Sequence, residues 1–142
     1  MKSRHKAREL ALQTLYALDF NNQLRSGIPQ DFIGLSESEI AVLEPEVVVF
    51  ARYLIVGTLE HIDELDEMIS RFSTNRPIER IDIVDRNILR FSIFCLLYAK
   101  DIHSHVVIDE AVKLSQEFSS EVNYKFINGI LDSMQKQLHD NA

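Results

Sequence analysis

The stretch DIVDRNILRFSIFCLLYA, residues 82–99, decides the fold of this chain, because it has helical spacing and is apolar on most sides. Its apolar positions are Ile83, Val84, Ile88, Leu89, Phe91, Ile93, Phe94, Leu96 and Leu97. A helix that is apolar all round is buried among other elements and does not lie on a surface. We therefore predict a central helix over about 82–99, with the rest of the chain packed around it.

Amphipathic helical patterns lie on both sides of this segment. Apolar residues recur three or four positions apart over about 3–20, 46–72, 107–118 and 121–138. Ser36 and Glu39 form a capping box, which predicts a short helix in the otherwise loop-like region 21–45. No long segment shows the alternation of a strand, so we predict an all-α bundle of about six or seven helices.

Two glycines interrupt helical patterns, where each costs about 1 kcal/mol relative to alanine. Gly57 indicates a bend in the helix predicted over 46–72, or a close crossing with another helix. Gly129, which follows Asn128, indicates a close approach of the backbone to another helix or to a ligand, with packing the favoured explanation.

The length and composition suit one globular domain. The chain has 142 residues, of which 46% are hydrophobic and 26% charged, an ordinary balance for such a domain. Its one cysteine, Cys95, excludes a disulfide framework and any multi-cysteine metal site. No segment offers the roughly 20 apolar residues of a membrane helix, and no signal-peptide pattern is present. We expect a soluble cytoplasmic protein.

A search for catalytic or metal-binding patterns finds none that is complete. His103 and His105 flank Ser104, but no further ligand stands at a diagnostic spacing, so we predict no metal site and no cofactor. Cys95 lies within the most apolar helix, where a thiol is inert. Without a nucleophile paired to a base, we predict that the chain is not an enzyme.

The charge is distributed unevenly along the chain. The net charge is −7, yet the first eight residues carry only basic charges, on Lys2, Arg4, Lys6 and Arg8. Such a basic end on an acidic body indicates a local anion-binding surface, with a frayed, solvated terminus as the alternative.

Two segments suit single-stranded RNA, which proteins bind with cations along the phosphates and aromatic rings against the bases. Arg4 and Arg8 are neighbours on one helix face, and Tyr16 follows further along; the alternative for Tyr16 is a half-buried core position. The second segment runs from Phe118 to Gly129, across a turn and into the start of a helix, where free N–H groups attract anions.

Four blocks of the chain resemble the NusB family of bacterial transcription antitermination factors. They lie in order and are residues 4–16 (RHKARELALQTLY), 85–90 (DRNILR), 107–112 (VIDEAV) and 125–132 (KFINGILD). The resemblance implies an all-helical domain over 1–142, with packed subdomains over about 1–75 and 76–142. It implies binding of the boxA RNA of ribosomal RNA leader transcripts together with the ribosomal protein NusE. The resulting complex is expected to load onto RNA polymerase and suppress Rho-dependent termination.

Carried over by position, the resemblance implies specific contact residues. The implied RNA-binding residues are Lys2, Arg4, His5, Arg8, Tyr16, Phe118, Lys125 and Phe126, and the implied NusE-facing residues are Glu79 and Asp85. His5 stands where relatives have an arginine, so RNA contact there would depend on its protonation. A helical protein-interaction module or homodimer without RNA binding of its own remains the alternative.

Overall fold

α5 (Ile83–Tyr98) lies at the centre of the fold, as its apolar sequence predicts. All residues from 87 to 96 are buried, and the Asp82 side chain caps the helix by accepting a hydrogen bond from the Val84 N–H at 2.9 Å. The helices that contact α5 are α1 (Lys2–Phe20), α3 (Pro45–Glu60), α4 (Ile62–Phe72), α6 (Ser104–Phe118) and α7 (Asn123–Asp140). The hydrophobic core therefore surrounds one helix.

The computed structural model describes residues 2–140, with the side chains of Lys2 and Asp140 outside that description. Two short elements complete it, α2 (Glu37–Ala41) and the 3₁₀ helix η1 (Ile78–Arg80). Seven α-helices and no strand occur within these residues, which confirms the predicted all-α class. None of the described helices combines the length and the hydropathy needed to cross a bilayer.

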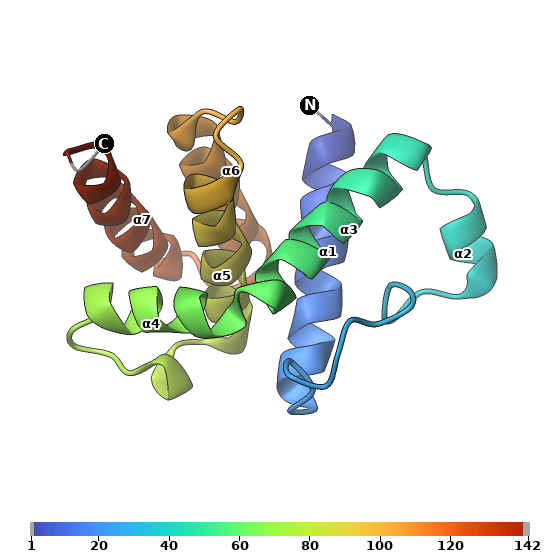
Figure 1. The fold of residues 1–142 in the computed structure, drawn as a ribbon, viewed down its shortest axis with the longest axis horizontal. Helices are drawn as coiled ribbons and strands as arrows, with labels where there is room; N and C mark the ends of the chain where they lie inside the picture. Colours follow the sequence, from blue (N-terminus) through green and yellow to red (C-terminus); the bar gives the residue numbers. More distant parts are fainter. Residues whose placement is uncertain (1, 141–142) are drawn as a thin grey trace.

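The helices form two groups that meet at α5 (Figure 1). α1 and α3 pack against each other on one side, α6 and α7 lie together on the other, and α4 runs crosswise below α6 and α7 (Figure 1). The predicted boundary near residue 75 falls in the connection between α4 and η1. The division into subdomains stays a prediction, since α5 contacts both groups.

One predicted helix is two helices. The apolar pattern over 46–72 continues through His61, but the backbone there leaves helical geometry, ending α3 and beginning α4. Periodicity reports which face of a segment is buried, and both helices turn their apolar faces to the same core, so the pattern alone does not show the break. The sequence offered a bend or a close helix crossing at Gly57. The structure shows a close crossing, since a Cβ there would collide with the Phe94 ring.

A charged cluster ties α1, α4 and α5 together. Asp19 accepts hydrogen bonds from Arg86 (2.7 and 2.9 Å), Asn87 (2.9 Å) and Arg90 (2.8 Å), and Arg90 also donates to Asp66 at 2.7 Å. Burial opposes the charged form of Asp19, but the hydrogen bond from Arg86 and the charge of Arg90 outweigh it and lower its pKa. The packing of these three helices therefore depends on largely buried ions that satisfy one another.

Candidate nucleic-acid interface

Arg4 and Arg8 both lie over the ring of Phe50, from α3. The guanidinium carbons are 4.4 Å and 5.3 Å from the ring centroid, within the range of a cation–π interaction. Arg4 is half-buried, whereas Arg8 is only 4% exposed, and burial lowers its pKa, although an arginine stays charged. Arg8 thus lies inside the protein, contrary to the surface position expected from sequence, because its side chain folds onto α3.

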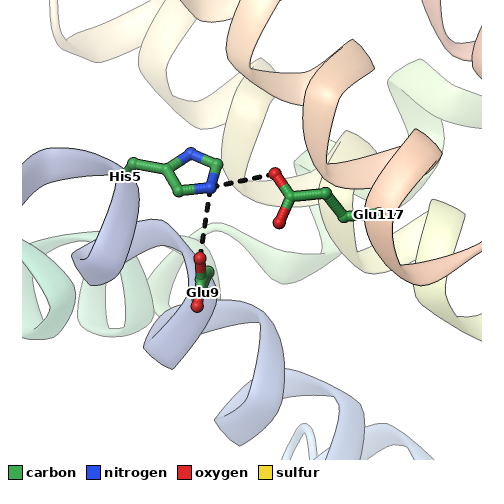
Figure 2. Close-up of side chains that lie close together, drawn as sticks. All are labelled: His5, Glu9 and Glu117. Carbon is green, nitrogen blue, oxygen red and sulfur yellow. Dashed lines mark ion pairs between the residues drawn. The ribbon is translucent and has the colours of Figure 1, made fainter. Parts of the chain in front are cut away.

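His5 is surrounded by carboxylates (Figure 2). Its Nδ1 lies 2.9 Å from Glu110, and its Nε2 lies 3.1 Å from Glu9 and 3.0 Å from Glu117. The hydrogen bond with Glu110 and the charges of the other two carboxylates outweigh burial and raise the pKa of His5. His5 therefore joins α1 to α6, and acids occupy both of its ring nitrogens.

Tyr16 lies apart from Arg4 and His5 on the same helix. It follows His5 by eleven residues, which places it about 16 Å along the axis and on nearly the same face. Tyr16 is 36% exposed and stacks on Phe20, with ring centroids 6.2 Å apart. The two rings form an exposed aromatic pair. The side chain of Lys2 lies outside the described residues.

The turn between α6 and α7 carries the other predicted residues. Phe118 ends α6, is 47% exposed, and directly follows Glu117, the residue paired with His5. Lys125 and Phe126 lie in the first turn of α7, where Lys125 is exposed and Phe126 is half-buried. The structure thus places Phe118 close to the N-terminal part of α1. Lys125 and Phe126 lie on the other side of the turn, at the start of α7.

A groove beside Phe126 adds a residue that sequence reasoning missed. The Arg76 guanidinium carbon lies 4.3 Å from the centroid of the Phe126 ring, and both line a groove of about 480 Å³ with Lys125. Arg76 lies in the connection after α4, outside every helical pattern, so only its charge could have drawn attention to it.

Gly129 opens onto the same groove. A Cβ there would meet nothing within 4 Å, so the packing explanation favoured from sequence is wrong. The space above this exposed helical backbone is open to solvent.

The two predicted partner-facing residues differ in position. Glu79 is exposed on η1, whereas Asp85 is 1% exposed and accepts hydrogen bonds from Ser115 (2.8 Å), Ser119 (2.8 Å) and Asn123 (2.9 Å). Burial raises the pKa of Asp85, and these hydrogen bonds oppose the rise. Asp85 is thus buried within the chain, whereas a partner-facing residue is expected on the surface. It joins α5 to the α6–α7 turn and so positions the residues on that turn.

Comparison with known proteins decides the family. The model of the NusB family matches residues 5–136. The chain belongs to the NusB family. It is 39% identical over 139 residues to the transcription antitermination protein NusB of Thermodesulfovibrio yellowstonii, covering 94% of this chain and 92% of the relative. The NusB protein of Myxococcus xanthus is 39% identical over 132 residues, with 93% and 94% covered.

Solved NusB structures share the fold. A structure of T. maritima NusB superposes with a TM-score of 0.78 at 30% identity, covering 94% of this chain and 90% of that one. A complex of the antitermination factors NusB and NusE with double-stranded RNA contains a chain that superposes with a TM-score of 0.80 at 28% identity, with 96% and 98% covered. The family membership inferred from the four sequence blocks is confirmed.

Proposed function

We propose that this chain is a non-catalytic transcription antitermination factor of the cytoplasm, which binds single-stranded boxA-type RNA together with NusE. In that role it joins the RNA polymerase antitermination complex and helps the enzyme resist Rho-dependent termination. The observation that carries the proposal is the family match over residues 5–136, in a chain whose relatives are antitermination proteins.

The geometry supports RNA binding at the α6–α7 turn and the adjoining end of α1. Arg4, Arg76 and Lys125 supply positive charge, while Phe118 and Phe126 supply rings. Cations that follow the phosphates and rings that stack on bases are the usual means of holding a single strand. Because the net charge of −7 is on average unfavourable for RNA, binding depends on such a local group of positive charges.

Three predicted residues have distinct parts in this proposal. Exposed Tyr16 offers a ring to a base further along α1, and exposed Glu79 is the candidate for contact with NusE. His5 lies beside the surface and acts on RNA only through the charge of its carboxylate cluster.

The test is a titration of fluorescent boxA RNA with the full chain, with and without NusE, at several salt concentrations. Lys125→Gln removes one phosphate contact, so binding weakens and the slope of log affinity against log salt becomes shallower by about 0.7. Lys136→Gln is the matched control, because it removes the same charge from the same helix about 16 Å away. Phe118→Ala removes an exposed ring and weakens binding by about 1–3 kcal/mol, the value of one stacked base.

Two outcomes would contradict the proposal. Equal effects of Lys125→Gln and Lys136→Gln would mean that the α7 start is not the contact surface. Absence of RNA binding even with NusE present would favour the alternative, a helical protein-interaction module or homodimer, which sedimentation of the isolated chain would then distinguish.

A further inference from the structure

The side chains of His5, Glu9 and Glu117 converge on one point at the junction of α1 and α6. Figure 2 shows the two carboxylates approaching the same ring nitrogen, one from the same helix and one from α6. The Nε2–oxygen distances are 3.1 Å to Glu9 and 3.0 Å to Glu117, and all three donor atoms lie within 4.8 Å of one another. Glu117 lies more than 100 residues from His5 and Glu9 in the sequence, which is why spacing along the sequence predicts no metal site.

The two nitrogen–oxygen distances are close to those between neighbouring ligand atoms of a tetrahedral metal. Zinc binds imidazole nitrogen and carboxylate oxygen at about 2.0–2.2 Å, which puts neighbouring ligand atoms of a tetrahedron about 3.3 Å apart. The observed Nε2–oxygen distances are within about 0.3 Å of that separation. Only a small outward movement of two glutamate side chains would admit the ion.

A further carboxylate orients the imidazole as metal sites commonly do. Glu110 lies 2.9 Å from Nδ1, the nitrogen opposite to the one facing Glu9 and Glu117. A metal-binding histidine usually donates its second N–H to a carboxylate or carbonyl, which fixes the tautomer and leaves the other nitrogen free to ligate. Glu110 is only 12% exposed at its side chain, so it holds the ring from a nearly buried position.

The described part of the chain provides these carboxylates with no other cation at ion-pair distance. Among the described side chains, Glu9 and Glu117 form ion pairs only with His5, and both do so through Nε2. One N–H donates fully to one oxygen, so a single proton satisfies this pair of carboxylates poorly. A divalent cation would satisfy both at once.

From these contacts we propose that His5, Glu9 and Glu117 form a binding site for a divalent transition metal, zinc being the best fit, with Glu110 as a positioning residue. Nitrogen with carboxylate oxygen is a donor set that suits zinc better than magnesium or calcium. Three protein ligands leave a fourth position, and Glu117, with 44% of its side chain exposed, gives water access to it.

The experiment is calorimetric titration of chelator-treated full-length chain with zinc chloride, in a buffer that does not bind metals and without RNA. We expect one site per chain, no comparable binding of Mg²⁺, and visible absorption bands of tetrahedral Co²⁺ when cobalt replaces zinc. Glu117→Gln, a change on the surface, should weaken zinc binding at least tenfold, and Glu110→Gln should weaken it by about 10–100-fold.

Two control variants make the result specific. Glu60→Gln removes an exposed glutamate on α3. The double variant His103→Gln, His105→Gln removes two imidazoles that lie 5.4 Å from each other, outside the proposed site. Both should bind zinc as the unaltered chain does. The proposal is overturned if His5→Gln and Glu117→Gln, shown to be folded by circular dichroism, bind zinc like the unaltered chain. It is equally overturned if the unaltered chain binds none. Since no RNA is present, either result leaves the proposed function untouched.

Discussion

The same substitution at two helical glycines should change stability in opposite directions. Gly57 in α3 and Gly129 in α7 both lie within helices, where replacement by alanine gains about 0.5–1 kcal/mol from backbone conformational entropy. Their surroundings differ. A methyl group at position 57 would collide with the Phe94 ring, whereas one at position 129 would meet nothing within 4 Å.

The expected magnitudes follow from those surroundings. The Phe94 ring has little freedom to move, because Tyr53 and Tyr98 lie against it with centroids at 5.3 Å and 5.6 Å. Overpacking of this kind costs about 1–3 kcal/mol, which outweighs the gain in helix propensity. Gly57→Ala should therefore destabilise the protein by about 1–2 kcal/mol, and Gly129→Ala should stabilise it by about 0.5–1 kcal/mol.

Thermal unfolding followed by circular dichroism measures both changes. For a chain of this size 1 kcal/mol corresponds to about 3–4 °C, so Tm should fall by about 3–8 °C in Gly57→Ala and rise by about 2–4 °C in Gly129→Ala. A rise in Gly57→Ala equal to that in Gly129→Ala would refute the close crossing of α3 and α5. A fall in Gly129→Ala would refute the open position of Gly129.

Three further predictions concern an ion cluster, a buried thiol and a cation–π contact. Asp19→Asn leaves the charges of Arg86 and Arg90 incompletely paired, so urea unfolding at pH 7 should show a loss of about 3–5 kcal/mol. Because the folded pKa of Asp19 is lowered, its contribution is complete above the unfolded pKa of about 3.9 and is lost as the pH falls through the folded value. The difference in free energy of unfolding between Asp19→Asn and the unaltered chain should therefore shrink as the pH falls below about 3.9. A difference that does not depend on pH would contradict the ion pairs. Burial raises the pKa of Cys95 to about 12, so a thiol reagent at pH 8 should modify it only after denaturant is added; rapid modification of the folded chain would disprove its burial. A double-mutant cycle of Phe50→Leu with Arg4→Gln should give a coupling free energy of about 0.5–1 kcal/mol in unfolding. A coupling of zero would show that the cation–π interaction does not stabilise the protein.

Much of the fold follows from local patterns in the sequence. The predicted helices over about 3–20 and 82–99 agree with α1 and α5 to within one residue at each end, because apolar spacing and local caps act over one or two turns. The capping box at Ser36 and Glu39 forms as expected. The break at His61 was missed because two helices that share a core keep one periodicity across the join.

The candidate interface was harder to predict, because the position of a charge depends on distant partners. Arg8 has the sequence surroundings of a surface cation, yet it is buried, and its ring partner Phe50 lies 42 residues further along the chain. Asp85 is an acid near the start of a helix, a common exposed position, yet it is buried by contacts from α6 and α7. Arg76 has no neighbouring pattern, and its role depends on Phe126 from another helix.

The ion cluster of α1, α4 and α5 has a consequence for splitting the chain. Both acids, Asp19 and Asp66, precede the connection between α4 and η1, and both guanidinium groups, of Arg86 and Arg90, follow it. A cut in that connection separates these two acids from the arginines that pair with them, so each fragment alone leaves its part of the cluster unpaired, while the mixture contains complementary surfaces. The two pieces would suit a split-protein reporter, in which reassembly signals that two fused partners have met.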